Sequence, residues 1–203
     1  MSTTERIDVT STAGARLAAF LQNDGIVKGL EFPSLNRVVW SKWRYRPTDY
    51  SEVASSIGPG KVEVYEDPTR DDPGYASSSK GDSFLLPAGL GDKLDANLDV
   101  LVHEATYMVQ DYKRRRLSRL EAEMDAHFAQ ALYRVRSGKT FGPPALQLIP
   151  FIVAAKEFAD DASYMLSRAF RKLRDEMRSG VIGVYMYKYD DLDVKTRLDG
   201  ITH

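Results

Sequence analysis

Residues 101–112, LVHEATYMVQDY, have the spacing of an α-helix with two different faces. At about 100° per residue, six apolar side chains fall on one arc, which predicts the face that packs on the core. These are Leu98, Leu101, Ala105, Met108, Val109 and Tyr112. His103, Tyr107 and Gln110 fall together on the opposite side, one turn apart, with Glu104 about a quarter-turn away. The stretch therefore predicts a helix that points an imidazole, a phenol and a carboxylate towards one cleft.

A second helix is predicted to start from a cap at Ser118 and to run to about residue 136, because Glu121 completes a capping box with this serine. Its apolar stripe consists of Leu117, Leu120, Met124, Phe128, Leu132 and Val135. Glu121 and Asp125 fall inside this stripe, where a carboxylate is costly unless a cation, a metal or a hydrogen-bond donor compensates its charge. The expected solvent face consists of Arg119, Glu123, Gln130 and Arg134.

The two helices together resemble a known class of metalloproteases. His103-Glu104-Ala105-Thr106-Tyr107, followed by Glu121-Ala122-Glu123-Met124-Asp125, resembles the gluzincin branch of the zincins, in which HExxH precedes E-A-x-x-D on a later helix. The strand SFLLP (83–87) before the motif helix resembles compact bacterial zincin-like proteins. The resemblance covers about residues 83–137. It implies an α+β, zincin-like fold with a small sheet packed on a helical core, the motif helix, a second carboxylate-bearing helix and a long C-terminal helix.

The resemblance implies a role for each of five residues. His103, Glu121 and Tyr107 would bind a zinc ion, and Glu104 would be the general base of peptide or amide hydrolysis by metal-activated water. Asp125 would hydrogen-bond His103 and fix its tautomer. Tyr107 departs from the pattern, because it stands where the second histidine belongs and its phenol normally holds its proton to about pH 10. Tyr107 is thus expected to take part in catalysis at an atypical, impaired zinc site.

Two alternatives remain open at this point. In the first, a zincin-derived fold has lost its metal, Tyr107 donates its hydroxyl to Glu121 or Asp125, and the cleft of an inactive protein binds a partner or small ligand. In the second, the motif is accidental and the chain is an α-rich interaction protein. His127 as a substitute zinc ligand is disfavoured by its angle from Glu121 around the helix.

Composition narrows the class of protein. The 203 residues are 43% apolar and 10% aromatic, which suits one domain over 1–203, with an N-terminal helix and irregular segment (1–60), a sheet with the motif helices (61–137) and a C-terminal helical segment and strand (138–203). The chain has no cysteine, which excludes disulfide scaffolds, zinc ribbons and thiol nucleophiles. A net charge of −1 argues against nucleic acid and membrane surfaces as partners. The zincin resemblance implies a peptide or small-molecule substrate in the cleft.

The remaining segments are predicted from local patterns. A helix is expected at 12–23, strands at 61–67 and 83–87 with a polar loop (67–82) between them, a long helix at 145–178 and a strand at 181–189. The N-terminus lacks the order of a signal peptide, and the longest apolar segment (145–155) is interrupted by Pro150. A cytoplasmic location is therefore expected, with export by a leaderless route left open.

Overall fold

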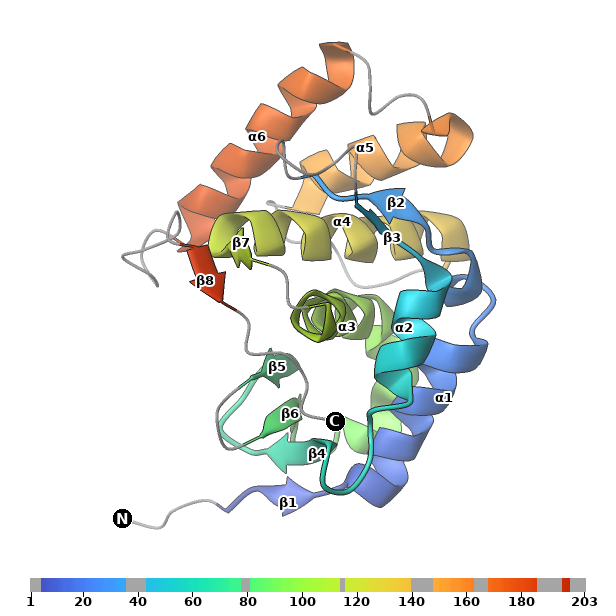
Figure 1. Ribbon diagram of the computed structural model, residues 1–203, viewed down its shortest axis with the longest axis vertical. Coiled ribbons are helices and arrows are strands. Elements are labelled where there is room, and N and C mark those ends of the chain that lie inside the picture. Colours follow the sequence, from blue (N-terminus) through green and yellow to red (C-terminus); the bar gives the residue numbers. More distant parts are fainter. Residues whose placement is uncertain are drawn as a thin grey trace. The chain divides into compact units, whose positions relative to one another are not determined.

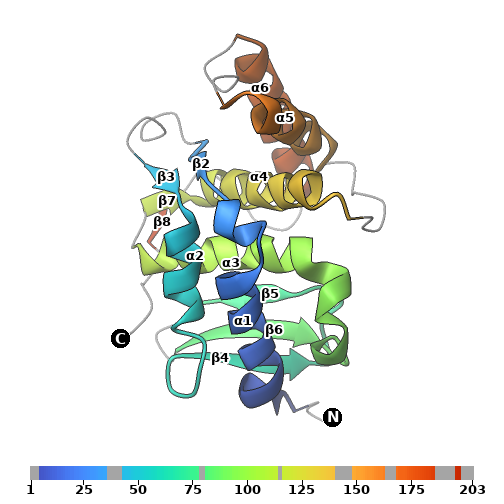
Figure 2. The same ribbon diagram turned by 90° about the vertical axis from the view of Figure 1, so that its right-hand side faces the viewer.

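The protein has an α+β fold in which two compact units are distinguished (Figures 1 and 2). A computed structural model describes residues 5–35, 43–77, 81–113, 116–139, 148–162, 168–185 and 195–197. The first unit consists of residues 1–29, 46–115 and 198–203, and the second consists of residues 30–45 and 116–197. The prediction of one zincin-like domain over 1–203 stays a prediction.

A four-stranded mixed sheet organises the first unit. Its strand order is β1 (Ile7–Asp8), β4 (Val62–Asp67), β6 (Asp82–Pro87) and β5 (Gly74–Ala76), with β4 and β6 parallel and both outer strands antiparallel to their neighbours. The strands predicted at 61–67 and 83–87 are confirmed. Strand β5 lies inside the segment predicted as a polar loop, so this prediction is wrong for residues 74–76. Three residues are too few for an alternating pattern, and only pairing with β6 makes them a strand.

Three helices cover the sheet of the first unit. In Figure 1 the helices α1 (Ala15–Asn23) and α2 (Pro47–Ala54) lie on one side of the sheet, and α3 (Leu98–Tyr112) lies beside β5. Figure 2 shows α3 running along the direction of the strands. The helices predicted at 12–23 and around the motif are confirmed.

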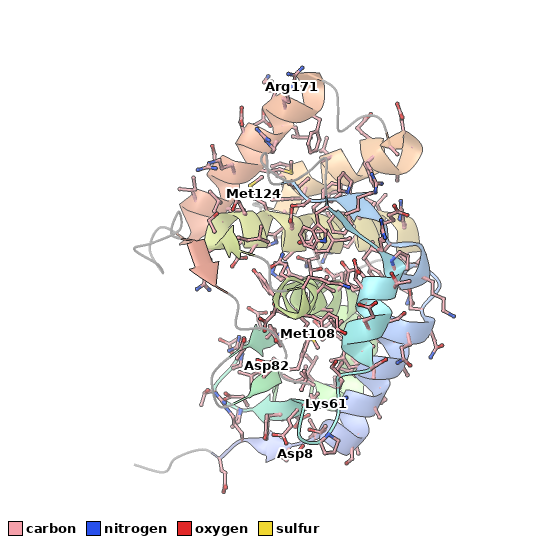
Figure 3. The ribbon with its side chains drawn as sticks, viewed as in Figure 1. Asp8, Lys61, Asp82, Met108, Met124 and Arg171 are labelled. Atoms are coloured by element: carbon pink, nitrogen blue, oxygen red, sulfur yellow. The ribbon has the colours of Figure 1, made fainter. Side chains whose placement is uncertain are left out.

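Helix α3 is buried on almost every side, which differs from the expectation of one core face and one cleft face. His103 and Gln110 are buried as completely as the apolar arc, and Tyr107 is half-buried. Helix α2 and strand β5 both pack against α3, so the polar side of the helix is covered as well. Met108, labelled in Figure 3, marks the apolar side.

Polar contacts fasten α3 to α2. The Tyr50 hydroxyl lies 3.1 Å from the Thr106 hydroxyl inside the core. At the C-terminal end of α3, the Lys113 ammonium lies 2.6 Å from Glu52 and 3.2 Å from Asp49. The motif helix is therefore joined to α2 by polar contacts in its middle and at its C-terminal end.

The second unit is built around α4 (Arg119–Ser137). Helices α5 (Ile149–Asp160) and α6 (Arg168–Tyr185) pack against it, together with the paired strands β2 (Phe32–Pro33) and β3 (Arg44–Tyr45). Strand β7 (Arg116–Ser118) pairs with β8 (Lys195–Arg197). The Phe32 ring stacks on Tyr45 at 4.5 Å and meets the edge of Phe128 at 5.4 Å. This aromatic cluster joins the β2–β3 pair to α4.

The C-terminal predictions are partly wrong. The stretch predicted as one helix over 145–178 is divided into α5 and α6, and the predicted strand at 181–189 begins inside α6. Residues 186–189 lie outside the described residues. Phe170, Met177 and Val181 are buried, and their spacing of seven and four residues places them on one face of the helix. Packing of this face therefore overrides the β-propensity of the segment that begins at residue 181. None of the described helices combines the length and apolar character that a membrane span requires.

Candidate functional site

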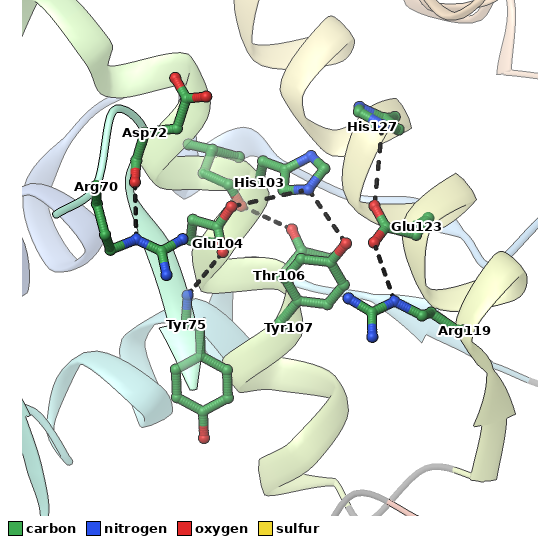
Figure 4. A network of polar contacts seen from close by, with 11 residues as sticks. Arg70, Asp72, Tyr75, His103, Glu104, Thr106, Tyr107, Arg119, Glu123 and His127 are labelled. Carbon is green, nitrogen blue, oxygen red and sulfur yellow. Dashed lines mark hydrogen bonds and ion pairs between the residues drawn. The ribbon is translucent and has the colours of Figure 1, made fainter. Parts of the chain in front are cut away.

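Helix α3 brings His103, Glu104 and Tyr107 together. The His103 Nε2 atom lies 3.3 Å from the Tyr107 hydroxyl and 3.9 Å from Oε1 of Glu104 (Figure 4). The imidazole and phenol rings meet edge to face, with centroids 5.1 Å apart. Residues four apart are neighbours on a helix, so the contact with Tyr107 follows from the sequence spacing. A carboxylate oxygen and a phenol oxygen therefore both lie within 3.9 Å of one imidazole nitrogen.

Strand β5 holds the Glu104 carboxylate in place. The backbone N–H of Tyr75 donates to Oε2 of Glu104 at 2.8 Å, while Oε1 faces His103. Since β5 is the outer strand of its sheet, alternate N–H groups point away from β6 and can bind other groups. One oxygen of Glu104 is thus anchored, and the other is directed towards the imidazole.

A second contact between β5 and α3 lies at Tyr75. Its hydroxyl donates to Oδ2 of Asp111 at 2.7 Å, and Asp111 is fully buried. Burial raises the pKa of the Tyr75 phenol well above its usual range, and the negative charge of Asp111 raises it further, so this phenol remains a donor. Tyr75 and Asp111 were not expected from the sequence. The only available signal was that Asp111 follows Glu104 by seven residues, or two helical turns.

Asp125 is fully buried in the second unit, as predicted. Its Oδ2 accepts from the Ser34 hydroxyl at 2.6 Å and the Tyr45 hydroxyl at 2.9 Å, and its Oδ1 accepts from the Leu35 N–H at 2.6 Å. Burial raises the pKa of Asp125 to about 7, although the three donated hydrogen bonds act in the opposite direction. The predicted bond from Asp125 to His103, which belongs to the first unit, stays a prediction.

Glu121 caps the helix that carries it. The Ser118 N–H donates to Oε2 of Glu121 at 2.9 Å, and the Glu121 N–H donates to the Ser118 hydroxyl at 3.2 Å. This capping box was predicted and is confirmed. Glu121 is only half-buried, and its role as a zinc ligand stays a prediction.

Glu123 and Gln130 are buried, which corrects their predicted place on a solvent face. Every residue from 122 to 133 is buried, because α4 is the central helix of its unit and has no free side along this length. The Glu123 carboxylate lies 3.8 Å from Nε of Arg119 and 3.9 Å from Nε2 of His127 (Figure 4). A helical wheel places the side chains of one isolated helix, so it cannot show which faces of that helix are covered by neighbouring elements.

His127 is expected to make the second unit less stable in acid. Burial lowers its pKa from 6.5 to about 4, and a smaller effect of Gln130 acts in the opposite direction. The stability from the neutral imidazole is therefore complete above pH 6.5 and is lost as the pH falls through 4. A pKa difference of this size corresponds to on the order of 3 kcal/mol. In urea titrations, His127→Gln should differ from the parent protein by an amount that shrinks between pH 7 and 4, and a constant difference would contradict it.

The 3.3 Å contact between His103 Nε2 and the Tyr107 hydroxyl is a hydrogen bond, which by itself does not indicate a metal. The described residues, which include His103, Glu104 and Glu121, contain no group of three or more histidine, cysteine or acidic side chains that could hold a metal ion. The roles of His103, Tyr107 and Glu121 as zinc ligands therefore stay predictions.

Comparison with protein-family models, curated proteins and solved structures finds no match to this chain. The zincin resemblance consequently rests on the motif residues themselves.

Proposed function

We propose that the protein is a zincin-like metallohydrolase with an atypical metal site on α3, acting on peptide or amide bonds. His103 and Tyr107 hold the zinc ion, and Glu104 is the general base. The observation that supports this most directly is the convergence of Glu104 Oε1 and the Tyr107 hydroxyl on His103 Nε2, with the other Glu104 oxygen held by Tyr75. In this proposal Glu121 completes the ligand set and Asp125 orients His103, as the resemblance implies.

The chain's own residues supply orientation and proton transfer. A zinc ion bound here would polarise a carbonyl and favour ionisation of its water. Oε1 of Glu104 accepts the proton of the attacking water, because the bond from Tyr75 leaves that oxygen turned to the imidazole. The Tyr107 oxygen either serves as a ligand or, when protonated, donates to the carbonyl oxygen of the substrate. The burial of His103 and Glu104 keeps bulk water away from both groups.

Replacing Glu104 by glutamine is expected to reduce zinc-dependent hydrolysis of a random peptide pool by about 10²- to 10⁴-fold, because the amide cannot take a proton. Glutamine keeps an oxygen that can accept from the Tyr75 N–H, so circular dichroism and urea midpoints should barely change. Formation of new amino groups measures the rate. Glu5→Gln, at an exposed position, is the matched control. Unchanged hydrolysis in the Glu104 variant would remove this residue from the mechanism.

A metal-free binding protein of zincin descent is the second candidate. The observation that favours it is the hydrogen bond between the Tyr107 hydroxyl and His103 Nε2, because it engages the nitrogen that a metal would need. Here Tyr107 replaces the ion as the partner of the imidazole, and the protein binds a partner or small ligand without cleaving it. Atomic emission of protein equilibrated with zinc separates the candidates: one bound equivalent supports the hydrolase, and none supports the binding protein.

A further inference from the structure

Arg70 places a cation next to the contact between Tyr75 and Glu104. Its Nε donates to the backbone carbonyl of Asp72 at 3.0 Å, which orients the guanidinium. A Cβ added at Gly74 would lie 2.3 Å from Nη2 and 3.4 Å from Nη1, so the guanidinium rests on the glycine of β5. Because Gly74 is bonded to Tyr75, the guanidinium lies within roughly 6 Å of the Tyr75 nitrogen. Figure 4 shows these groups together.

Arg70 has no ion-pair partner within the part of the chain that the structure describes, although Glu104 lies near it. Asp72 meets it through the backbone carbonyl alone, and both Asp71 and Asp72 turn to solvent. With Nε engaged, the Nη donors remain for a ligand, and their fixed fork matches the two oxygens of a carboxylate. Arg70 is half-buried, so part of its hydration is already removed.

We propose that Arg70 is a specificity-determining residue that binds a carboxylate of the substrate beside the bond that is cleaved. The substrate class is therefore an acidic peptide, recognised through an Asp or Glu side chain or a chain terminus. This inference rests on the proposed function and names the ligand of the same site. Gly74 has a part in it, because any larger residue would occupy the place of the guanidinium.

The test compares three pools of hexapeptides randomised at five positions with every amino acid except Asp and Glu. The sixth position is Glu in the first pool and Gln in the second, both with blocked ends, and the third is the Gln pool with a free C-terminal carboxylate. Cleavage is followed in zinc-loaded protein. In metal-free protein, binding is followed by the ¹⁵N resonance of Arg70 Nε, assigned by its loss in Arg70→Lys.

The zinc-loaded parent protein is expected to cleave a carboxylate-bearing pool at least about tenfold faster than the Gln pool, since a hydrogen bond to a charged group contributes about 1.5–3 kcal/mol. The Arg70 Nε resonance should shift with the same pool. Arg70→Gln should lose the preference, and Arg70→Lys should keep part of it, as a point charge without the fork. Which acidic pool is preferred identifies the source of the carboxylate.

Gly74→Ala tests the geometry while keeping the charge. The new methyl group displaces the guanidinium, so this variant should lose the preference as Arg70→Gln does. Gly58→Ala is its control, because an added Cβ there meets nothing within 4 Å. Lys61→Gln removes one positive charge as Arg70→Gln does. Lys61 precedes the first residue of β4, whereas Arg70 follows its last residue, and Figure 3 labels Lys61. This variant should leave the preference for acidic pools intact.

The outcomes separate the two proposals. A shift of the Arg70 resonance with an acidic pool, without cleavage of any pool, supports the carboxylate site and overturns the hydrolase. Cleavage at equal rates without a shift overturns the carboxylate site and leaves the hydrolase standing. A preference for acidic pools that persists in Arg70→Gln also overturns the role of Arg70. If no pool is cleaved and the Arg70 resonance does not shift, both proposals are overturned.

Discussion

Asp125→Asn is expected to be more stable than the parent protein, and this difference in the free energy of unfolding should grow as the pH rises from 4 to 8. The folded pKa of Asp125 is raised from 3.8 to about 7, mainly by burial. Its stabilising contribution is therefore complete below pH 3.8 and is lost as the pH rises through 7. A pKa difference of this size corresponds to on the order of 4 kcal/mol, and a neutral asparagine does not incur this loss. Urea midpoints at five pH values measure the effect.

Asparagine can replace the protonated acid with little other cost. Its amide oxygen can accept from the Leu35 N–H, and its NH₂ group can donate to the hydroxyls of Ser34 and Tyr45. Asp160→Asn, at an exposed position in the same unit, is the control for the change of charge. If the difference between Asp125→Asn and the parent protein does not vary with pH, the raised pKa is refuted.

Asp125 and His127 have opposite effects on how the stability of the parent protein depends on pH. Acidification from pH 7 to 4 restores the contribution of Asp125 and removes that of His127, since burial raises the first pKa and lowers the second. The two changes are of similar size. From these two groups we expect the free energy of unfolding of the parent protein to change little between pH 4 and 7. Replacing Asp125 should leave the pH dependence due to His127, and replacing His127 should leave that due to Asp125.

Tyr107→His is expected to bind zinc at least about 100-fold more tightly than the parent protein. Loss of a group that merely supports a ligand costs roughly 10- to 100-fold in affinity, so restoring a ligand should gain more. A neutral imidazole needs no deprotonation of a phenol, and residues four apart on α3 already face each other. Competition with a chromophoric chelator measures the affinity, and atomic emission measures the stoichiometry.

Two variants give the zinc experiment its controls. Tyr112→His makes the same replacement on α3, nine residues from His103 and on the opposite side of the helix, and should gain no affinity. The double variant His103→Ala, Tyr107→His should lose what Tyr107→His gains. If neither the parent protein nor Tyr107→His binds zinc, the motif is accidental and the proposed hydrolase is excluded.

Part of the candidate site could be predicted from the sequence. The meeting of His103 with Tyr107 follows from their spacing, and the capping box of Ser118 and Glu121 follows from the same kind of local rule. The inward position of Asp125 followed from the apolar stripe around it. Its partners did not, because Ser34 and Tyr45 lie 91 and 80 residues away along the chain.

Local sequence patterns were enough to predict the helices α3 and α4 and the strands β4 and β6, because apolar periods of this kind repeat within a few residues or turns. Two other features depend on tertiary packing: Gly74–Ala76 joins the sheet, and the Tyr75 N–H holds Glu104. The burial of Glu123 and the helical conformation of Val181 depend on packing as well. Strand pairing and burial involve neighbours that are distant in sequence, and no local pattern records how these are arranged.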